Sequence, residues 1–347
     1  TYNQIQAKRL LKDLLYFNDK VAIFPKKELV TYDYIAESKD LPYERIEILN
    51  KIHENKINIL IVTIESVMQD LLPKDVLYKN TIKLSVGDII KIDYLKQKLI
   101  DLGYERKELI DGRGQFSVRG GIVDISMSEN QGIRLEFWGD EIDSIRRFDI
   151  ISQRSIEMIN SYQINPSHEY ILENGLDKVI ENIEKYNYEN KQNLKEDIEI
   201  IRSGDYISKI DKYFNCFYSK KSNILEYVNN FTLVFDEYIK ISQRVDNIKI
   251  ENNNIVKNLI DKEKSVPDVI SNLVEFKNVY KDVIEKNEEK SENTNIYLFK
   301  DDIVTQKLTN TIFNFNYRDI LFYKNEIESL CNNLQDSIKK KKKIIIL

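Results

Sequence analysis

The fold of the central region is decided by two stretches, QFSVRGGIVDI at residues 115–125 and IRLEFWGDEIDSIRRF at residues 133–148. Within each stretch apolar and polar residues alternate, which is the period of a half-buried β-strand. Glycine interrupts both, and Gly139-Asp140 has the composition of a two-residue hairpin turn. The pattern therefore predicts two strands joined by a turn in each of the two stretches.

The surrounding residues, 79–155, predict a small α+β domain inserted in a larger one. They hold eight of the ten glycines and seven of the twelve arginines of the chain. Glycine at this density is typical of tight turns between short strands, because it adopts positive φ at no steric cost. One helix is expected from Asp93 to Leu102, with Asp93 as N-cap and Gly103 just after its end.

The flanking regions predict α/β architecture. Residues 1–78 alternate helical and strand patterns: helices at Asn3–Phe17, around Pro42 and at Ser66–Leu72, and strands at Val21–Phe24 and Ile57–Val62, the latter fully buried. Such alternation implies a parallel sheet with helices on its faces. The opening Thr1-Tyr2-Asn3 resembles a loop that follows a strand, so we expect the chain to begin inside a domain.

Residues 156–320 return to α/β character, with strands expected at Leu233–Phe235, Ile296–Phe299 and Thr311–Asn316. Residues 321–347 end on the apolar run Ile344–Leu347, which predicts the start of a further α/β domain that is truncated.

Composition limits the classes of function. The net charge of −5 disfavours a protein whose whole surface binds nucleic acid. The chain has no apolar run long enough for a membrane span and no export leader, so we expect a cytoplasmic location and no membrane partner. Cys216 and Cys331 have no metal-site spacing and are expected to be buried and inert, and we predict no catalytic residue and no metal site.

Strand alternation also yields a candidate binding surface. Ile133, Leu135 and Phe137 should face the core, which leaves Arg134, Glu136 and Trp138 on the wetter face. By the same rule Phe116 and Val118 point inward, while Gln115, Ser117 and Arg119 point outward. Arginine beside an aromatic ring is typical of binding hot spots. The alternative is that Trp138 covers the rear of the sheet and the arginines pair with nearby acids.

A second candidate site follows the apolar run Thr232–Phe235. Asp236 and Glu237 imitate the acidic pair that ends a strand in P-loop ATPases. The phosphate-binding motif Gly-x-x-x-x-Gly-Lys-Ser/Thr does not occur in this sequence. Asp236 and Glu237 are therefore interpreted as a strand-end turn or the remnant of a nucleotide site, with a working nucleotide-dependent ATPase as the alternative.

Several segments taken together resemble the UvrA-binding domain shared by UvrB and the transcription-repair coupling factor: Leu102–Arg106, Gly114–Ile125, Arg134–Arg146 and Gln153–Ser155. Phe24-Pro25, Glu44–Leu49 and Pro166–Glu169 are similar to the amino-terminal region of the coupling factor. Only some twenty residues separate Phe24 from Glu44, too few for the DNA-clamping hairpin of UvrB. The resemblance therefore favours the coupling-factor family, with a fragment of a UvrB-type DNA-loading helicase as the alternative.

The resemblance implies a UvrB-like module of two degenerate, RecA-like helicase halves, domain 1a (residues 1–78) and domain 1b (156–320), with the UvrA-binding domain 2 (79–155) between them. The family's UvrA contacts carry over onto Arg119, Arg134 and Trp138, where the family usually has phenylalanine at the last position. Arg134→Ala is then expected to weaken UvrA binding by on the order of 1.5 to 3 kcal/mol without unfolding the domain.

The implied function is non-catalytic docking of UvrA, which recruits nucleotide excision repair to stalled RNA polymerase. In the family, ATP and magnesium serve separate translocase domains, so this fragment is expected to bind no cofactor. RNA polymerase and double-stranded DNA are bound by domains outside this chain, and a carboxyl-terminal domain can mask the UvrA-binding surface.

Overall fold

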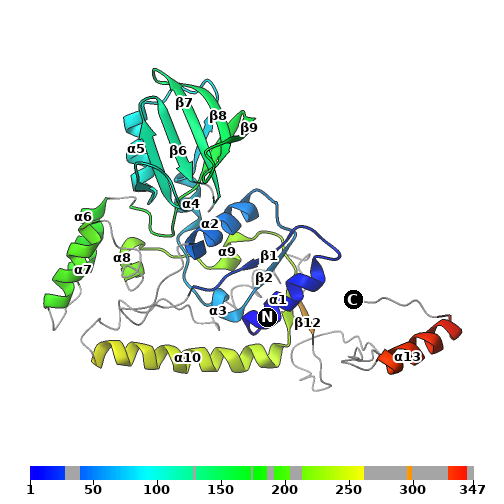
Figure 1. Ribbon diagram of the computed structural model, residues 1–347. Helices are drawn as coiled ribbons and strands as arrows, with labels where there is room; N and C mark the ends of the chain where they lie inside the picture. The colour runs from blue at the N-terminus through cyan, green and yellow to red at the C-terminus, as the bar shows by residue number, and fades with distance from the viewer. Residues whose placement is uncertain are drawn as a thin grey trace. The chain divides into compact units, whose positions relative to one another are not determined.

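The computed structural model describes residues 1–27, 40–126, 128, 130–172, 175–185, 191–203, 213–261, 295–298 and 327–341 (Figure 1). The chain divides into two compact units, Thr1–Asp302 and Ile303–Leu347. In the second unit the described element is the helix α13 (Ile327–Lys339), none of whose residues is buried. The elements below belong to the first unit.

The central region forms a six-stranded sheet in the order β4-β5-β6-β7-β8-β9 (Figure 1). The strands are β4 (Glu105–Arg106), β5 (Gln115–Arg119), β6 (Ile122–Ser126), β7 (Gln131–Trp138), β8 (Glu141–Asp149) and β9 (Ser155–Ile159). Neighbours are antiparallel except for the parallel pair β4 and β5. The predicted hairpin turn is confirmed, because Trp138 pairs with Glu141 and Gly139 has a φ of +65°.

One face of this sheet packs against the helix α5 (Ile92–Asp101). Leu95 and Leu99 of the helix join a buried cluster with the inward residues of the strands, among them Phe116, Val123, Ile125, Ile133 and Leu135. The inward assignment of Phe116, Ile133 and Leu135 is thereby confirmed. Gly103 follows the helix with a φ of +85°, as expected of a terminating glycine.

The predicted N-cap of α5 was wrong by two positions. The helix begins at Ile92 after Lys91, whose side chain makes no capping hydrogen bond. Asp93 lies in the first turn, where its carboxylate pairs with Lys96 Nζ at 2.7 Å. An acidic side chain in the first turn interacts favourably with the helix dipole, so the preference for aspartate near a helix start is satisfied without capping.

The strands that lead into and out of the sheet region pair with each other. β3 (Ile82–Ser85) is antiparallel to β10 (Ser161–Ile164), with Ile82 opposite Ile164. The chain therefore leaves and rejoins the remainder of the unit at one place, which is the geometry of an inserted domain. The residue limits predicted for the individual domains stay predictions.

Residues 1–27 and 40–79 form helices and strands in alternation, as expected. α1 (Gln4–Leu14) begins after Asn3, whose side chain accepts a hydrogen bond from the Gln6 amide at 2.8 Å. β1 (Val21–Phe24) and β2 (Ile59–Val62) are parallel, and α2 (Asp40–His53) precedes β2. β2 is less buried than predicted: within it only Ile61 is buried.

The helix predicted at Ser66–Leu72 is shorter and starts earlier. α3 spans Ile64–Val67 with Thr63 as its N-cap. Beyond it the Leu71 amide donates to the carbonyl of Ser222 at 2.7 Å, so a long-range bridge replaces the next helical turn. α4 (Lys74–Lys79) then begins after Pro73.

The later part of the first unit is largely helical. Its helices are α6 (Leu176–Glu184), α7 (Lys191–Ser203), α8 (Phe214–Phe217), α9 (Ile224–Tyr227) and α10 (Tyr238–Asp261). β11 (Leu233–Asp236) is parallel to β12 (Asn295–Leu298), which confirms two of the predicted strands to within a residue or two. The strands predicted at Thr311–Asn316 and Ile344–Leu347 lie outside the described residues.

One hydrophobic core joins the two regions that flank the sheet domain. Phe24 and Leu49, from the first region, share a buried cluster with Ile224, Phe235 and Val245 from the second. Ile241, Val245 and Ile248 recur at helical spacing on α10 and so give it one buried face. The α/β class is confirmed for both flanks, while their assignment as RecA-like halves stays a prediction.

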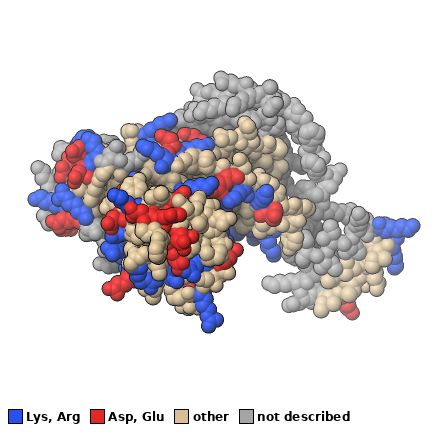
Figure 2. Space-filling view, turned by 90° about the horizontal axis from the view of Figure 1, so that it is seen from above, with Lys and Arg blue, Asp and Glu red and all other residues tan. Residues whose placement is uncertain are grey.

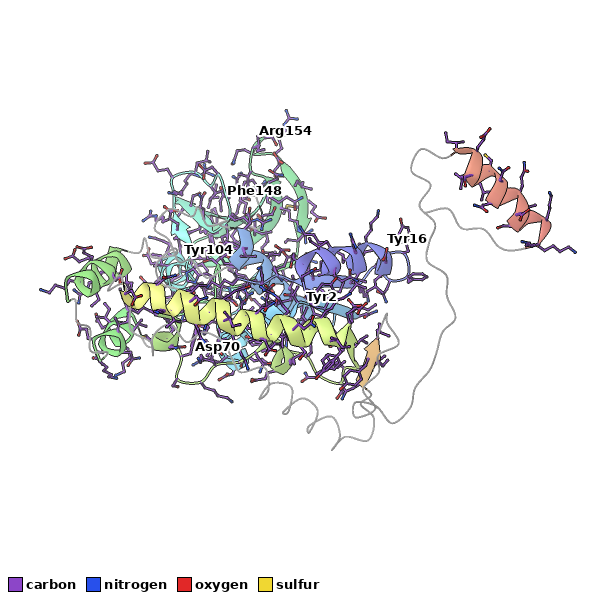
Figure 3. The ribbon with its side chains drawn as sticks, turned by 90° about the horizontal axis from the view of Figure 1, so that it is seen from below. Tyr2, Tyr16, Asp70, Tyr104, Phe148 and Arg154 are labelled. Carbon is purple, nitrogen blue, oxygen red and sulfur yellow. The ribbon has the colours of Figure 1, made fainter. Side chains whose placement is uncertain are left out.

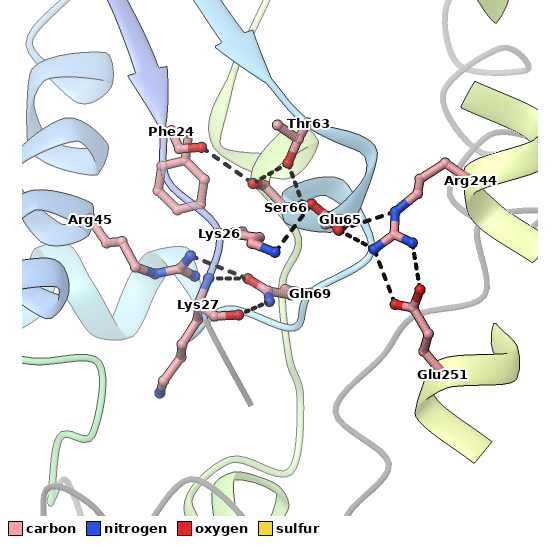
Figure 4. A network of polar contacts seen from close by, with 10 residues as sticks. All are labelled: Phe24, Lys26, Lys27, Arg45, Thr63, Glu65, Ser66, Gln69, Arg244 and Glu251. Carbon is pink, nitrogen blue, oxygen red and sulfur yellow. Dashed lines mark hydrogen bonds and ion pairs between the residues drawn. The ribbon is translucent and has the colours of Figure 1, made fainter. Parts of the chain in front are cut away.

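A polar network also ties these flanks together (Figure 4). The backbone of Phe24 and Lys27, at the end of β1, bonds to Ser66 and Gln69 at 3.3 and 2.8 Å. Glu65 of α3 pairs with Arg244 of α10, which also pairs with Glu251 at 2.7 Å. These contacts lock α3 between β1 and α10 in addition to the apolar core.

The two cysteines differ, contrary to expectation. Cys216 is buried, as predicted, and burial raises the pKa of its thiol to about 12. Cys331 is exposed, because α13 has no buried residue. Of the helices within the described ranges, none combines the length and the hydropathy needed to cross a membrane.

Candidate functional site

The candidate surface is the face of the six-stranded sheet opposite α5. Strand register places Ser117, Asp124, Arg134 and Arg146 directly opposite one another across β5 to β8. Side chains on neighbouring strands in register lie close enough to interact. The sheet therefore forms a row of polar and charged groups on this face.

Asp124 holds both predicted arginines. Arg119 Nη2 lies 2.6 Å from Asp124 Oδ2, while Arg134 Nε and Nη2 lie 2.6 and 2.8 Å from Oδ1 and Oδ2. The Asp124 side chain is 0% exposed, that of Arg134 15% and that of Arg119 45%. The structure thus brings Arg119 and Arg134 together, on one buried carboxylate.

Arg134 has two further supports. Its Nη2 donates to Gln153 Oε1 at 2.9 Å, and its guanidinium lies over the ring of Phe148, 4.5 Å from the centroid. The hydrogen bond to Asp124 raises the pKa of Arg134, and burial opposes this shift. Arg134 is thus held on several sides within the sheet domain.

Phe148, which is labelled in Figure 3, belongs to a small second core on this face, together with Ile110 and Ile150. Gly132 makes room for it: a Cβ at that position would lie 2.6 Å from Phe148 Cε1. A larger residue could not stand at position 132 without displacing the ring.

Gln115 and Ser117 point to the expected face but are buried, which corrects the prediction that this part of the surface is wet. The Gln115 side chain accepts hydrogen bonds from the amides of Asp111 and Gly112 at 2.8 and 3.1 Å. The loop between β4 and β5 therefore folds back over this end of the face. Strand alternation assigns a side to each residue, but it does not show what covers that side.

Trp138 stands apart from the arginine cluster. It is 83% exposed, so it does not cover the rear of the sheet. It lies four residues beyond Arg134 on β7, a distance of about 13 Å along a strand. Phe137, predicted to face the core, is half-buried and packs against the inner cluster, just after a register shift between Glu136 and Phe137.

The sequence reasoning missed Asp124. Its position was visible, since in the strand Ile122–Ser126 the residues Val123 and Ile125 are apolar and Asp124 falls on the opposite face. The pairing partner depends on register, which brings Asp124 opposite Arg134. Both arginines therefore do pair with a nearby acid, the alternative raised from sequence, while Arg119 stays partly exposed.

A second ion pair continues the row. Arg146 pairs with Glu136, and Ser144 Oγ donates to Glu136 Oε2 at 2.8 Å. Figure 2 shows the same mixture on a larger scale, with Lys and Arg interspersed among Asp and Glu over the described surface seen from above. A surface of mixed sign lacks the continuous positive charge with which proteins bind along a nucleic acid backbone.

Asp236 and Glu237 make the contacts of a strand-end turn. Asp236, the last residue of β11, accepts a hydrogen bond from Thr1 Oγ1 at 3.0 Å. Glu237 adopts a left-handed φ of +61°, its amide donates to Leu298 O at 3.0 Å, and its side chain lies 3.5 Å from Lys240 Nζ. Among the described residues no group of three His, Cys, Asp or Glu side chains could hold a metal ion.

The sheet domain is similar to a known family of domains. Residues 82–170 match the family described as the UvrB interaction domain. The match begins at the first residue of β3 and extends past β10. It covers all six strands of the sheet, Asp124 and the three predicted site residues.

The longer similarity is to transcription-repair-coupling factors. The protein of that name from Bacillus subtilis (strain 168) is 28% identical over 287 residues, which is 78% of this chain and 24% of that protein. That of Staphylococcus aureus (strain Mu50) is 30% identical over 277 residues, 75% of this chain and 24% of that protein. The chain thus spans about a quarter of the length of these relatives, and the resemblance stated from sequence is confirmed.

Proposed function

We propose that this chain is a docking module of a transcription-repair coupling factor, which binds UvrA and so recruits nucleotide excision repair to stalled RNA polymerase. The proposal follows from the similarity to proteins of that name and from the match to an interaction domain. The observation that carries it is the exposure of Trp138 on that domain, which also bears a partly exposed cation, Arg119.

Trp138 is the only tryptophan of the chain, and it is among the most exposed of the large hydrophobic residues described. A side chain of this size left in water contributes nothing to the core, whereas its burial against a partner removes a large apolar area from solvent. Tryptophan and arginine are the residues most enriched among binding hot spots. The family's usual phenylalanine offers a similar flat apolar ring, so the substitution keeps the kind of contact and changes its shape.

The arginines supply the other part of the recognition. Two guanidinium groups and one carboxylate leave a net positive charge at the Arg119, Asp124 and Arg134 cluster. A cation on an otherwise mixed surface favours an acidic group on the partner and determines orientation more than affinity. We therefore propose that the Arg119, Asp124 and Arg134 cluster meets an acidic side chain of UvrA while Trp138 is buried against an apolar patch.

The remaining activities belong, in this proposal, to other parts of a longer protein. Translocation on double-stranded DNA with ATP and magnesium, and contact with RNA polymerase, would be supplied by domains outside this chain. A carboxyl-terminal domain would mask the docking surface until activation. A bacterial protein that acts on chromosomal DNA works in the cytoplasm, which agrees with the predicted location.

The two alternatives receive less support. The relatives reported above are named coupling factors, which favours that family over a UvrB-type helicase. For a working ATPase, the positions of Asp236 and Glu237 would have to serve magnesium, whereas their contacts are those of a turn between β11 and α10. This chain is thus proposed to act by binding alone.

The test uses the single tryptophan. The chain is produced with 5-fluorotryptophan, and the ¹⁹F signal of Trp138 is followed by NMR while unlabelled UvrA is added. We expect the signal to shift or broaden, and calorimetry to show that Trp138→Ala weakens binding by roughly 30-fold, the effect of a typical hot spot. The matched control is Ile151→Ala, an 81% exposed apolar residue of the same domain, which should change the Kd less than about twofold. If the folded parent does not bind UvrA, or Trp138→Ala binds as tightly as the parent, the proposal is wrong.

A further inference from the structure

We propose that Asp124 is a positioning residue of the docking surface: its buried carboxylate anchors Arg119, which presents the positive charge to the partner, and holds Arg134 as an internal brace. This inference rests on the proposed UvrA-docking function. It assigns different roles to Arg119 and Arg134, which the resemblance alone treats as equivalent.

The hydrogen bonds of Arg134 are made within the sheet domain, so this side chain is an internal brace that supports the surface from inside. Its Nε and Nη2 both donate to Asp124, and Nη2 donates in addition to Gln153. A guanidinium uses the Nε and Nη2 edge for its best bidentate contact with a carboxylate, and in Arg134 that edge is already occupied. Only Nη1 remains for a partner, on a side chain that is 15% exposed.

Arg119, in contrast to Arg134, has most of its hydrogen-bond donors available to a partner. It is 45% exposed, and its Nη2 donates to Asp124 Oδ2. Most of its N–H donors, including Nε, remain for an acidic group on the partner. The Asp124 contact fixes the end of a long side chain that would otherwise be free to rotate.

Asp124 has both the burial and the charge that this role requires. Its side chain is 0% exposed, and Oδ2 receives both arginines. Without this carboxylate two guanidinium groups would lie close together with like charge, and Arg119 would have to be ordered when the partner binds. A side chain ordered in advance binds more tightly, because less conformational entropy is lost on association.

The brace also alters what an Arg134 variant measures. Arg134→Ala would leave the buried Asp124 carboxylate with one guanidinium fewer, so its effect on binding would include a loss of fold stability. Arg119 is the better probe of the partner contact, since it is half exposed. The test is therefore built on Arg119 and Asp124.

The experiment is a double-mutant cycle of UvrA binding with Arg119→Ala, Asp124→Asn and the double variant, each confirmed as folded by circular dichroism. We expect each single variant to weaken binding by roughly tenfold, the size of one charge-assisted hydrogen bond. In the Asp124→Asn background Arg119→Ala should cost less than about a further twofold, because Arg119 has already lost its anchor. The control Glu157→Gln, which removes a carboxylate paired with Arg147 on β8, should bind like the parent.

If the double variant instead binds roughly a hundredfold more weakly than the parent, the effects of the two substitutions are independent, and Asp124 does not position Arg119. A second readout needs neither UvrA nor the Asp124→Asn variant. In the ¹⁵N NMR spectrum of the parent, the Nη–H protons of Arg119, whose Nη2 donates to Asp124, should exchange with water more slowly than those of Arg154, which is exposed and lies at the periphery of the sheet domain (Figure 3). Equal exchange rates would show that Arg119 is not anchored. If UvrA does not bind the folded parent, the docking function fails, and the exchange comparison still decides whether Asp124 anchors Arg119.

Discussion

Replacing Glu169 by glutamine should destabilise the contact between α2 and the segment that follows the sheet domain. Arg45 Nε and Nη2 lie 3.0 and 3.1 Å from the two carboxylate oxygens of Glu169, and the two side chains are 1% and 3% exposed. Arg45 Nη1 also donates to the carbonyl of Pro25 at 2.6 Å. The pair therefore joins α2, the end of β1 and the last residues of the UvrB interaction match.

The magnitude follows from burial. Removing one partner of a buried ion pair typically costs 3 to 5 kcal/mol, because the remaining charge stays uncompensated in a medium of low dielectric constant. Glutamine keeps the shape and one acceptor oxygen, so we expect the lower end, about 3 kcal/mol, which is roughly 150-fold in the opening equilibrium. Replacing both partners, Arg45→Met with Glu169→Leu, should recover much of that loss, because no unpaired charge remains.

The assay is native-state hydrogen exchange of the buried amides of α2, which reports local opening and does not require the whole chain to unfold in one step. Exchange in Glu169→Gln should be faster by about two orders of magnitude. The matched control is Glu157→Gln, whose pair with Arg147 is 50% exposed on the glutamate side and should matter by less than about 1 kcal/mol. Exchange in Glu169→Gln within twofold of the parent would refute the argument that burial makes this pair essential.

Three further outcomes are expected. Burial, aided by the charge of Lys27, lowers the pKa of His168 to about 4. Between about pH 6.5 and about pH 4 the unfolded chain therefore binds a proton that the folded chain does not, so the free energy of unfolding should fall as the pH drops through this range. In urea titrations at several pH values, His168→Gln should make this dependence on pH weaker. Gly132→Ala should lower stability by about 1 to 3 kcal/mol in thermal unfolding, through overlap with Phe148, and a second change Phe148→Leu should relieve part of it; an unchanged melting temperature would contradict the packing. Native protein at pH 8 should react with Ellman's reagent at Cys331 only, and at Cys216 after unfolding, because burial raises the pKa of the Cys216 thiol to about 12; rapid reaction of both thiols would be inconsistent with its burial.

Much of the sheet domain could be predicted from its sequence because the evidence is local. The alternation in residues 133–138 assigns Ile133 and Leu135 to the core, and Gly139-Asp140 determines the hairpin. Gly103 as the end of α5 follows from the same short-range chemistry. Each of these features depends on a few consecutive residues.

The candidate site was predicted in part. Alternation placed Arg119, Arg134 and Trp138 on one face, and the structure shows the first two on one carboxylate and the third exposed. Asp124 was missed, because its role depends on the registers of β5 with β6 and of β6 with β7. Gln115 and Ser117 were expected in water and are buried.

By itself the sequence determined the strand faces, the hairpin turn, the glycine that ends α5 and the family resemblance, because period and glycine placement are properties of neighbouring residues. The tertiary structure alone decided which charges meet and which surfaces are covered. Arg45 pairs with Glu169, Leu71 forms a β-bridge with Ser222, and Phe24 packs in one core with Phe235. In each pair the two residues are more than a hundred positions apart in the sequence. Such contacts form only when distant segments pack together, so no local pattern encodes them.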